Sequence, residues 1–282
     1  MTSLTLPAAR SPAGQFAREF LLFGLKQAWA CLFGGAMLAL IIATKLLWQS
    51  DWAMNRYDFL FVAAFAIQGA LIALKLESWE EAKVIFLFHV VGTIMEIFKT
   101  AMGSWAYPEE AFFRIGGVPL FSGFMYACVG SYIARTTRIF NLRYERFPPF
   151  WMSVVLAGLI YVNFFLHHYV WDIRYGLFAL ALLLYGRCSL HFTVDRVPRH
   201  MPMLLSTFLV AFFVWIGENV GTNSGTWIYA GQKIGWHLVS WGKLGSWFLL
   251  MFVSFVLVSL IHRPQAPDNK GACTGGVPHR IN

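Results

Sequence analysis

Two glutamates in this sequence begin the same pattern of residues, and carboxyl groups can hold or transfer a proton. Glu96 begins the run Glu-Ile-Phe-Lys-Thr-Ala-Met-Gly-Ser-Trp-Ala-Tyr, and Glu218 begins the run Glu-Asn-Val-Gly-Thr-Asn-Ser-Gly-Thr-Trp-Ile-Tyr. Both runs have the form E-x3-T-x2-G-x-W-x-Y, and their starts lie 122 positions apart. The match predicts an internal repeat with one carboxyl group at the same position of each half.

The spacing predicts that each glutamate shares a helix face with a threonine, because helical residues four positions apart lie on one face. These pairs are Glu96 with Thr100 and Glu218 with Thr222, and His89 extends the first face inward. If the two faces meet in the fold, one carboxyl can be held protonated and donate a proton. Its ionised partner can then accept a proton or stabilise a cation.

Aromatic residues follow both glutamates and are expected to form a roof over this site. Gly103 and Gly225 come first in each run, and each allows the backbone to turn tightly after its helix. The aromatic pairs come next and favour headgroup depth in a membrane. We expect the following side chains to contact a ligand there: Trp105, Tyr107, Trp227 and Tyr229.

A structural role for the glutamates is the alternative, in which each carboxylate pairs with a nearby cation. The candidate cations are Lys99, Arg56 and Arg174. His167 is a further candidate for ligand binding, but the adjacent His167 and His168 point about 100° apart on a helix. No recognised metal-ligand spacing is present, so we predict no metal and leave the cofactor open.

The composition predicts an integral membrane protein. The 282 residues are 58% hydrophobic and 13% charged, with a mean hydropathy of +0.58. A soluble domain carries about twice that share of charged residues. The net charge of +8 would suggest nucleic acid as a partner of a soluble protein, but here the basic residues fall between apolar stretches, where they set topology. We therefore expect the lipid bilayer as partner and no nucleic acid.

Eight apolar stretches are long enough to cross a bilayer, which takes about 20 residues. They are Ala28–Trp48, Asp58–Leu76, Ala82–Thr100, Val118–Thr136, Phe150–Tyr169, Tyr175–Phe192, Met201–Val220 and Val239–Ile261. The fold class expected is an all-α membrane protein, with eight spans in two parallel four-helix repeats. The repeats are parallel because an even number of spans separates the two motifs.

The basic residues predict that both termini lie in the cytoplasm. Of the 22 Lys and Arg residues, 15 then lie on the inner side. The other seven are Lys45, Arg56, Lys99, Arg114, Arg174, Lys233 and Lys243. Such a bias is typical of inner segments. The predicted location is the bacterial cytoplasmic (inner) membrane.

The domain organisation follows from the spans and the repeat. We expect a cytoplasmic leader at 1–27, disordered over its first 16 residues, and a first repeat at 28–134. A cytoplasmic linker at 135–149 contains Pro148-Pro149, and a second repeat covers 150–262. A disordered cytoplasmic tail at 263–282 is rich in Gly, Pro and polar residues. The oligomeric state is left open.

Several motifs are similar to those of the DUF817 (domain of unknown function 817) family of bacterial multi-spanning membrane proteins. They are Arg56-Tyr57-Asp58, Leu76-Glu77, Glu81-Ala82-Lys83-Val84-Ile85, Glu96-Ile97-Phe98-Lys99, Gly103-Ser104-Trp105-Ala106-Tyr107-Pro108, and Gly117-Val118-Pro119-Leu120 with Ser122-Gly123-Phe124-Met125-Tyr126. The resemblance covers nearly the whole chain between its tails and implies a membrane protein without an assigned activity. A weaker likeness, to membrane carotenoid cyclases and hydratases, lies in a helix-end Glu followed by Gly, aromatic residues and Gly-x-Pro.

Two functions fit these residues. The first is an enzyme that acts on an apolar lipid such as an isoprenoid, with Glu96, Glu218 and His89 in acid–base chemistry. The alternative is a transporter or permease with a proton, cation or small-molecule site between the repeats. A scaffold without catalytic activity is a third class. Carboxylates near one membrane face favour the enzyme, whose candidate ligand is an apolar lipid.

Overall fold

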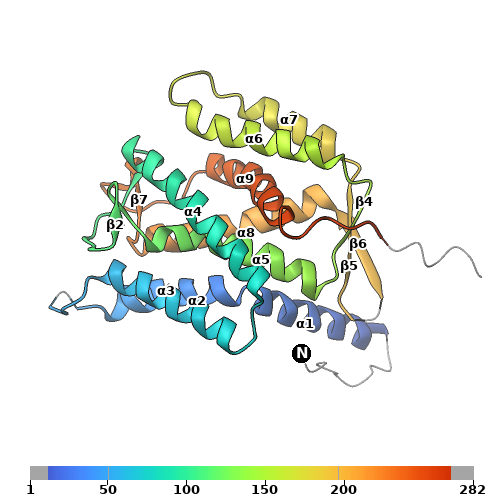
Figure 1. Ribbon diagram of the computed structural model, residues 1–282, viewed down its shortest axis with the longest axis horizontal. Helices are drawn as coiled ribbons and strands as arrows, with labels where there is room; N and C mark the ends of the chain where they lie inside the picture. Colours follow the sequence, from blue (N-terminus) through green and yellow to red (C-terminus); the bar gives the residue numbers. More distant parts are fainter. Residues whose placement is uncertain (1–11, 50, 196, 268–282) are drawn as a thin grey trace, which may run out of the picture.

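The computed structural model describes residues 12–49, 51–195 and 197–267, and helices dominate it (Figure 1). The helices are α1 (Pro12–Ala30), α2 (Leu32–Leu47), α3 (Arg56–Ala73), α4 (Trp79–Ala101), α5 (Phe121–Ile139), α6 (Phe150–Leu166), α7 (Arg174–Tyr185), α8 (Met203–Asn223) and α9 (Trp241–Ser259). Each of the eight predicted apolar stretches overlaps one helix from α2 to α9.

The protein is mainly helical, and four of its described helices are long and apolar enough to cross a membrane. These helices are α3, α4, α8 and α9. A fifth crossing is counted if α1 and α2, which meet at a bend of 70°, form one broken span. Helices α6 and α7 are apolar but have only 17 and 12 residues.

Seven short strands among the described residues correct the expectation of an all-α fold. The strands β1 (Trp105–Ala106) and β7 (Ile228–Tyr229) pair, as do β2 (Arg114–Ile115) and β3 (Val118–Pro119). A third sheet has the order β4 (Arg143–Glu145), β5 (Ser189–Thr193) and β6 (Pro198–Pro202). The predicted sixth span therefore ends early, at Tyr185, because the residues after it pair as a strand instead of continuing the helix.

The predicted ends of the chain also need correction. Residues 12–16 were expected to be disordered, but they begin helix α1, which packs against α5. Arg18 of α1 forms an ion pair with Asp195, 3.0 Å away, and Glu19 accepts a hydrogen bond from Arg199. These contacts hold α1 against β6 and the turn between β5 and β6. The rest of the predicted leader, residues 1–11, and the tail residues 268–282 lie outside the described residues.

The two halves share several pairs of neighbouring helices. In the first half α2 packs on α3 and α5, and α4 packs on α5; in the second half α6 packs on α7 and α9, and α8 packs on α9. Helices α5 and α9 contact each other and join the halves. Figure 1 shows α6 and α7 on one side of the molecule, α1 to α3 on the other, and the remaining helices between them.

Helices α4 and α8 end in the same way, at the end of the molecule where β1 and β7 lie. After α4, Ser104 N–H donates to the Lys99 carbonyl; after α8, Thr226 N–H donates to the Gly221 carbonyl. A hydrogen bond from an N–H to the carbonyl five residues earlier closes the end of a helix. It forms when the residue just before the donor adopts a left-handed conformation. Gly103 and Gly225 do so, with φ of 69° and 68°, which confirms the predicted glycine turns.

Candidate functional site

The carboxylate of Glu96 is buried and accepts three hydrogen bonds from aromatic side chains. Its Oε2 accepts from Trp105 Nε1 at 2.6 Å and from the Tyr107 hydroxyl at 2.7 Å. Its Oε1 accepts from the Tyr126 hydroxyl of α5 at 2.8 Å. A buried charge is costly unless donors surround it. These neutral donors supply that compensation without a cation in contact.

The carboxylate of Glu218 is held by a similar set of donors. Its Oε1 accepts from the Tyr229 hydroxyl, and its Oε2 accepts from Trp247 Nε1 of α9. Each glutamate is thus bound by the tyrosine of its own motif and by one aromatic residue of the following helix. Tyr126 and Trp247, which fill this second role, lie 121 positions apart, close to the spacing of the glutamates.

The strand pair β1–β7 brings the two carboxylates into one cluster. Trp105 lies opposite Tyr229, and Ala106 lies opposite Ile228. The rings of Trp105 and Tyr229 meet edge to face, with centroids 6.0 Å apart, and those of Tyr126 and Trp247 lie 6.1 Å apart. The two aromatic pairs therefore connect the carboxylates of the two halves.

Lys243, near the start of α9, is the cation of this cluster. Its Nζ lies 4.5 Å from the ring centroid of Trp105 and 4.3 Å from that of Tyr229. Burial disfavours its charge, which Glu218 and then Glu96 attract. The cluster therefore joins two carboxylates, one ammonium group and the faces of aromatic rings.

The two loop tyrosines are fixed as hydrogen-bond donors. Burial, followed by the neighbouring charge of Glu96, holds the pKa of Tyr107 well above its ordinary value. Burial, followed by the charge of Glu218, does the same to the pKa of Tyr229. Both phenols stay protonated at neutral pH, so each can donate to its carboxylate.

A small cavity lies beside the cluster, between α4, α5 and α9. Its volume is about 20 Å³, and its lining includes Tyr126, Trp247, Met95 and Val253. This volume holds about one water molecule. Both glutamates are buried, and this cavity is too small for an isoprenoid chain.

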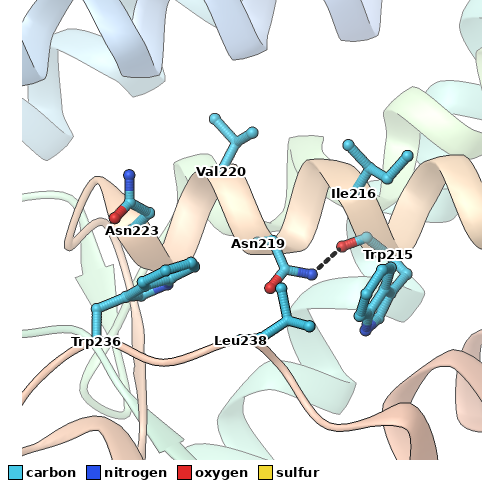
Figure 2. Close-up of a pocket in the computed structure, with 7 residues that line it drawn as sticks. All are labelled: Trp215, Ile216, Asn219, Val220, Asn223, Trp236 and Leu238. Carbon is cyan, nitrogen blue, oxygen red and sulfur yellow. Dashed lines mark hydrogen bonds between the residues drawn. The ribbon is translucent and has the colours of Figure 1, made fainter.

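A larger groove lies on the outside of α8 and contains none of the predicted site residues (Figure 2). Its volume is about 310 Å³, and its lining is Trp215, Ile216, Asn219, Val220, Asn223, Trp236 and Leu238. The Asn219 side chain donates to the Trp215 carbonyl at 2.8 Å and accepts from Val239 N–H at 2.8 Å. Its polar atoms thus hold the loop before α9 against α8.

Other predicted site residues lie apart from the carboxylates. The His89 ring packs on Phe124 with centroids 4.4 Å apart, and its Nδ1 has no hydrogen-bond partner among the described residues. The Thr100 hydroxyl likewise has none there. Thr222 accepts a hydrogen bond from Trp236 Nε1 at 3.1 Å. Of the predicted site residues, Trp105, Tyr107, Tyr229 and the two glutamates come together.

Trp227 differs from its counterpart Trp105. A methyl group at Gly221 would lie 2.0 Å from the Trp227 ring, so the ring packs against the helix at this glycine. Trp227 therefore packs on α8 in a position where Trp105 hydrogen-bonds a carboxylate. The site is only approximately symmetric.

The ion pairs suggested as a structural role for the glutamates are not formed. Lys99 contacts His168 Nε2 at 2.9 Å and His167 Nε2 at 3.3 Å, and its Nζ lies over the Phe164 ring. Arg56 instead pairs with Glu109 at 2.7 Å, and Arg174 pairs with Asp172. The prediction that the glutamates pair with these three cations was wrong, because other acceptors lie closer to each cation.

Sequence reasoning missed three members of the cluster, namely Lys243, Tyr126 and Trp247. The repeat spacing could have found the two aromatic residues, because they occupy near-equivalent positions. Lys243 had been counted only as a charge that sets topology.

A second buried charged group was also missed. Arg135 and Glu77 are both buried, with Nη2 and Oε1 3.5 Å apart. Ser131 donates to Glu77 at 3.0 Å, Gln68 donates to its other oxygen, and Arg135 donates to the carbonyls of Trp29 and Leu76. This network ties α5 to the loop between α3 and α4.

The side chains that the structure describes include no group of three or more His, Cys, Asp or Glu able to hold a metal ion. Cys31, Cys128 and Cys188 are free thiols, and Cys273 lies outside the described residues.

Comparison with known proteins gives one family, one curated relative and solved structures. The family described as "Protein of unknown function (DUF817)" matches residues 19–255. The protein YoaT of Bacillus subtilis (strain 168), itself described as uncharacterized, is 40% identical over 252 residues, which are 89% of this chain and 95% of YoaT. The crystal structure of a mycobacterial Insig homolog from Mycobacterium vanbaalenii matches with a TM-score of 0.48 and 14% identity, and the alignment covers 67% of this chain and 98% of that chain.

Proposed function

The chain belongs to the DUF817 family of proteins of unknown function, and we propose that it is a membrane transport protein with a proton or cation site between two parallel four-helix repeats. The observation that carries the proposal is the cluster around Glu96 and Glu218, which receives donors from both halves. Sites for coupling ions in transporters lie at such repeat interfaces.

The register of β1 and β7 supports the repeat. In the sequence motif Trp105 corresponds to Trp227, Ala106 to Ile228 and Tyr107 to Tyr229. A twofold axis between the two strands pairs Ala106 with Ile228 and pairs each Trp with the Tyr of the other half. The observed pairs, Ala106 with Ile228 and Trp105 with Tyr229, follow this register.

The direction of the repeats is supported by the ends of α4 and α8. Both helices end beside the β1–β7 pair, so their carboxyl groups lie at one end of the molecule. Inverted repeats would put them at opposite ends. We propose eight spans, α2 to α9, in the cytoplasmic membrane of a bacterium, with both termini in the cytoplasm and the carboxylates near the outer face.

The chemistry proposed for the site is exchange of a proton or small cation. Glu96 and Glu218 supply two negative charges in a low-dielectric region, while Lys243 supplies one positive charge. Binding of a proton or cation would offset the remaining negative charge. Release would restore the arrangement in which aromatic N–H and O–H groups and Lys243 stabilise both carboxylates.

A second candidate is an enzyme that acts on an apolar lipid, with the same carboxylates as acid and base. The cavity beside Tyr126 and Trp247 favours it, because its lining is largely apolar and adjoins the residues that hydrogen-bond the carboxylates. This function requires the cavity of about 20 Å³ to enlarge when the lipid enters. His89, seven residues before Glu96 and therefore on the same face of α4, would then act two turns away.

Proton flux in reconstituted vesicles tests the proposal. We expect the full chain to exchange protons or cations across the bilayer, and Glu96→Gln and Glu218→Gln each to abolish this flux while the protein still folds. Glu110→Gln, at an exposed loop position, is the matched control and should leave flux unchanged. Full flux in both site variants would refute the proposal. A lipid product that is found in extracts with the unmodified protein, and is absent with the glutamate variants, would favour the enzyme.

A further inference from the structure

The surroundings of the Lys243 ammonium group have the chemistry of a cation-binding cage. The ring faces of Trp105 and Tyr229 lie 4.5 and 4.3 Å from Nζ, one from each half of the protein. Aromatic faces attract cations, and organic ammonium ions are recognised by such cages. The carboxylates of Glu218 and Glu96 add long-range attraction.

Lys243 is poorly placed for a purely structural cation. It is the third residue of α9, and the positive end of a helix dipole disfavours a cation in the first turn. Gly242 and Gly245 lie on either side of it. The ammonium group of Lys243 forms neither a hydrogen bond nor an ion pair with the residues that the structure describes, so the rings and the more distant carboxylates hold its charge.

We infer that the space between Trp105, Tyr229 and the two glutamates is a binding site for a small organic ammonium ion, and that the Lys243 ammonium is its tethered occupant. This inference rests on the proposed cation site and names the class of its ligand. An external alkylammonium ion enters when the Lys243 side chain swings out, and the same two rings and two carboxylates then bind it.

The occupancy by Lys243 has a direct consequence for affinity. An external ion must displace a tethered group of equal charge, so the unmodified protein binds it weakly. Removal of the Lys243 charge leaves two carboxylates with aromatic faces and no cation. Such a variant binds an alkylammonium ion more tightly because no competitor remains.

Thermal unfolding of the purified full chain in detergent tests this competition with methylammonium chloride, against sodium chloride of equal ionic strength. A ligand that binds only the folded state raises stability with concentration. We expect Lys243→Met to respond to methylammonium at about tenfold lower concentration than the unmodified protein. Lys233→Met, at an exposed loop position, is the control and should behave like the unmodified protein.

Two further measurements make the result decisive. Adding Trp105→Leu to Lys243→Met should remove the methylammonium response. If Lys243→Met does not fold, amine-reactive labelling of the unmodified protein replaces it, with tetramethylammonium as the probe because it has no N–H that reacts with the reagent, and this ion should increase labelling of Lys243. The inference is overturned if Lys243→Met responds equally to both salts, if Trp105→Leu leaves its response intact, or if labelling is unchanged. Loss of ion flux in the glutamate variants is a separate result, so the proposed function can hold when this inference fails.

Discussion

Trp105 lies opposite Tyr229 in the antiparallel pair of β1 and β7, and each of these side chains hydrogen-bonds a different buried glutamate. The two loops that follow α4 and α8 are therefore fixed to each other and to both carboxylates. A movement of one half relative to the other would change both carboxylate environments together. This coupling makes the strand pair the first place to perturb.

We predict that Gly221→Ala strongly destabilises the protein, whereas Gly217→Ala does not. A methyl group at Gly221 would lie 2.0 Å from the Trp227 ring, so the ring would have to move, at a cost of about 1–3 kcal/mol. Nothing lies within 4 Å of a methyl group at Gly217, where alanine gains up to about 1 kcal/mol of helix propensity. Thermal unfolding midpoints of the two variants should move in opposite directions, and equal midpoints would contradict the packing described here.

We expect Tyr126→Phe to weaken the site and Tyr161→Phe to leave it intact. The first change removes a hydroxyl that donates to the buried Glu96 at 2.8 Å, and hydrogen bonds to charged groups contribute about 1.5–3 kcal/mol. Tyr161 donates to none of the residues that the structure describes, which makes it a matched control. Denaturation of both variants in one detergent provides the comparison. Equal stability of the two variants would mean that the hydrogen bond from Tyr126 to Glu96 does not contribute to stability.

The contact between α4 and the end of α6 should weaken in acid. Burial, then the charges of Lys99 and His167, lowers the pKa of His168 from 6.5. In its neutral form the ring accepts a hydrogen bond from Lys99 at Nε2. A base with a lowered folded-state pKa contributes stability above its unfolded-state pKa and loses it as pH falls. The unfolding midpoint should therefore drop as pH falls below about 6.5.

Replacement of the histidine identifies the source of this pH dependence. His168→Gln keeps an acceptor without titrating, so its midpoint should vary less between pH 7.5 and 5. His200→Gln, on β6 among the strands of the three-stranded sheet, is the control and should retain the full dependence. If both variants retain the full pH dependence of the unfolding midpoint, a group other than His168 causes it.

Loss of one partner in the buried pair of Glu77 and Arg135 should be among the most damaging single changes. Glu77→Ala leaves the arginine buried without its counter-charge, which costs about 3–5 kcal/mol. The double variant Glu77→Met, Arg135→Met removes both charges and should be more stable than the sum of the single effects implies. Additive effects in a double-mutant cycle would show that the two charges do not interact.

Reporter fusions test the proposed topology. A reporter joined after Ile261 should be active only as a cytoplasmic reporter, because that position follows the eighth proposed span. A reporter inserted after Lys233 should be active only on the outer side. The same compartment for both positions would rule out a span in α9.

The sequence by itself determined the features that depend on neighbouring residues. Apolar stretches located the helices from α2 to α9, since burial of a long run in lipid depends on its own composition. The repeated motif located the ends of α4 and α8, and Gly103 and Gly225 adopt the predicted turn because glycine tolerates positive φ.

Only the tertiary structure decided which partners surround each charge. Lys243 lies over Trp105 although they are far apart in sequence, and Lys99 contacts two histidines instead of Glu96, three residues before it. No local pattern encodes these choices, because a buried polar group is stabilised by whichever donors the packing brings within reach. Helix positions were therefore predictable from short segments, whereas the environment of Glu96 and Glu218 required the packing of both halves.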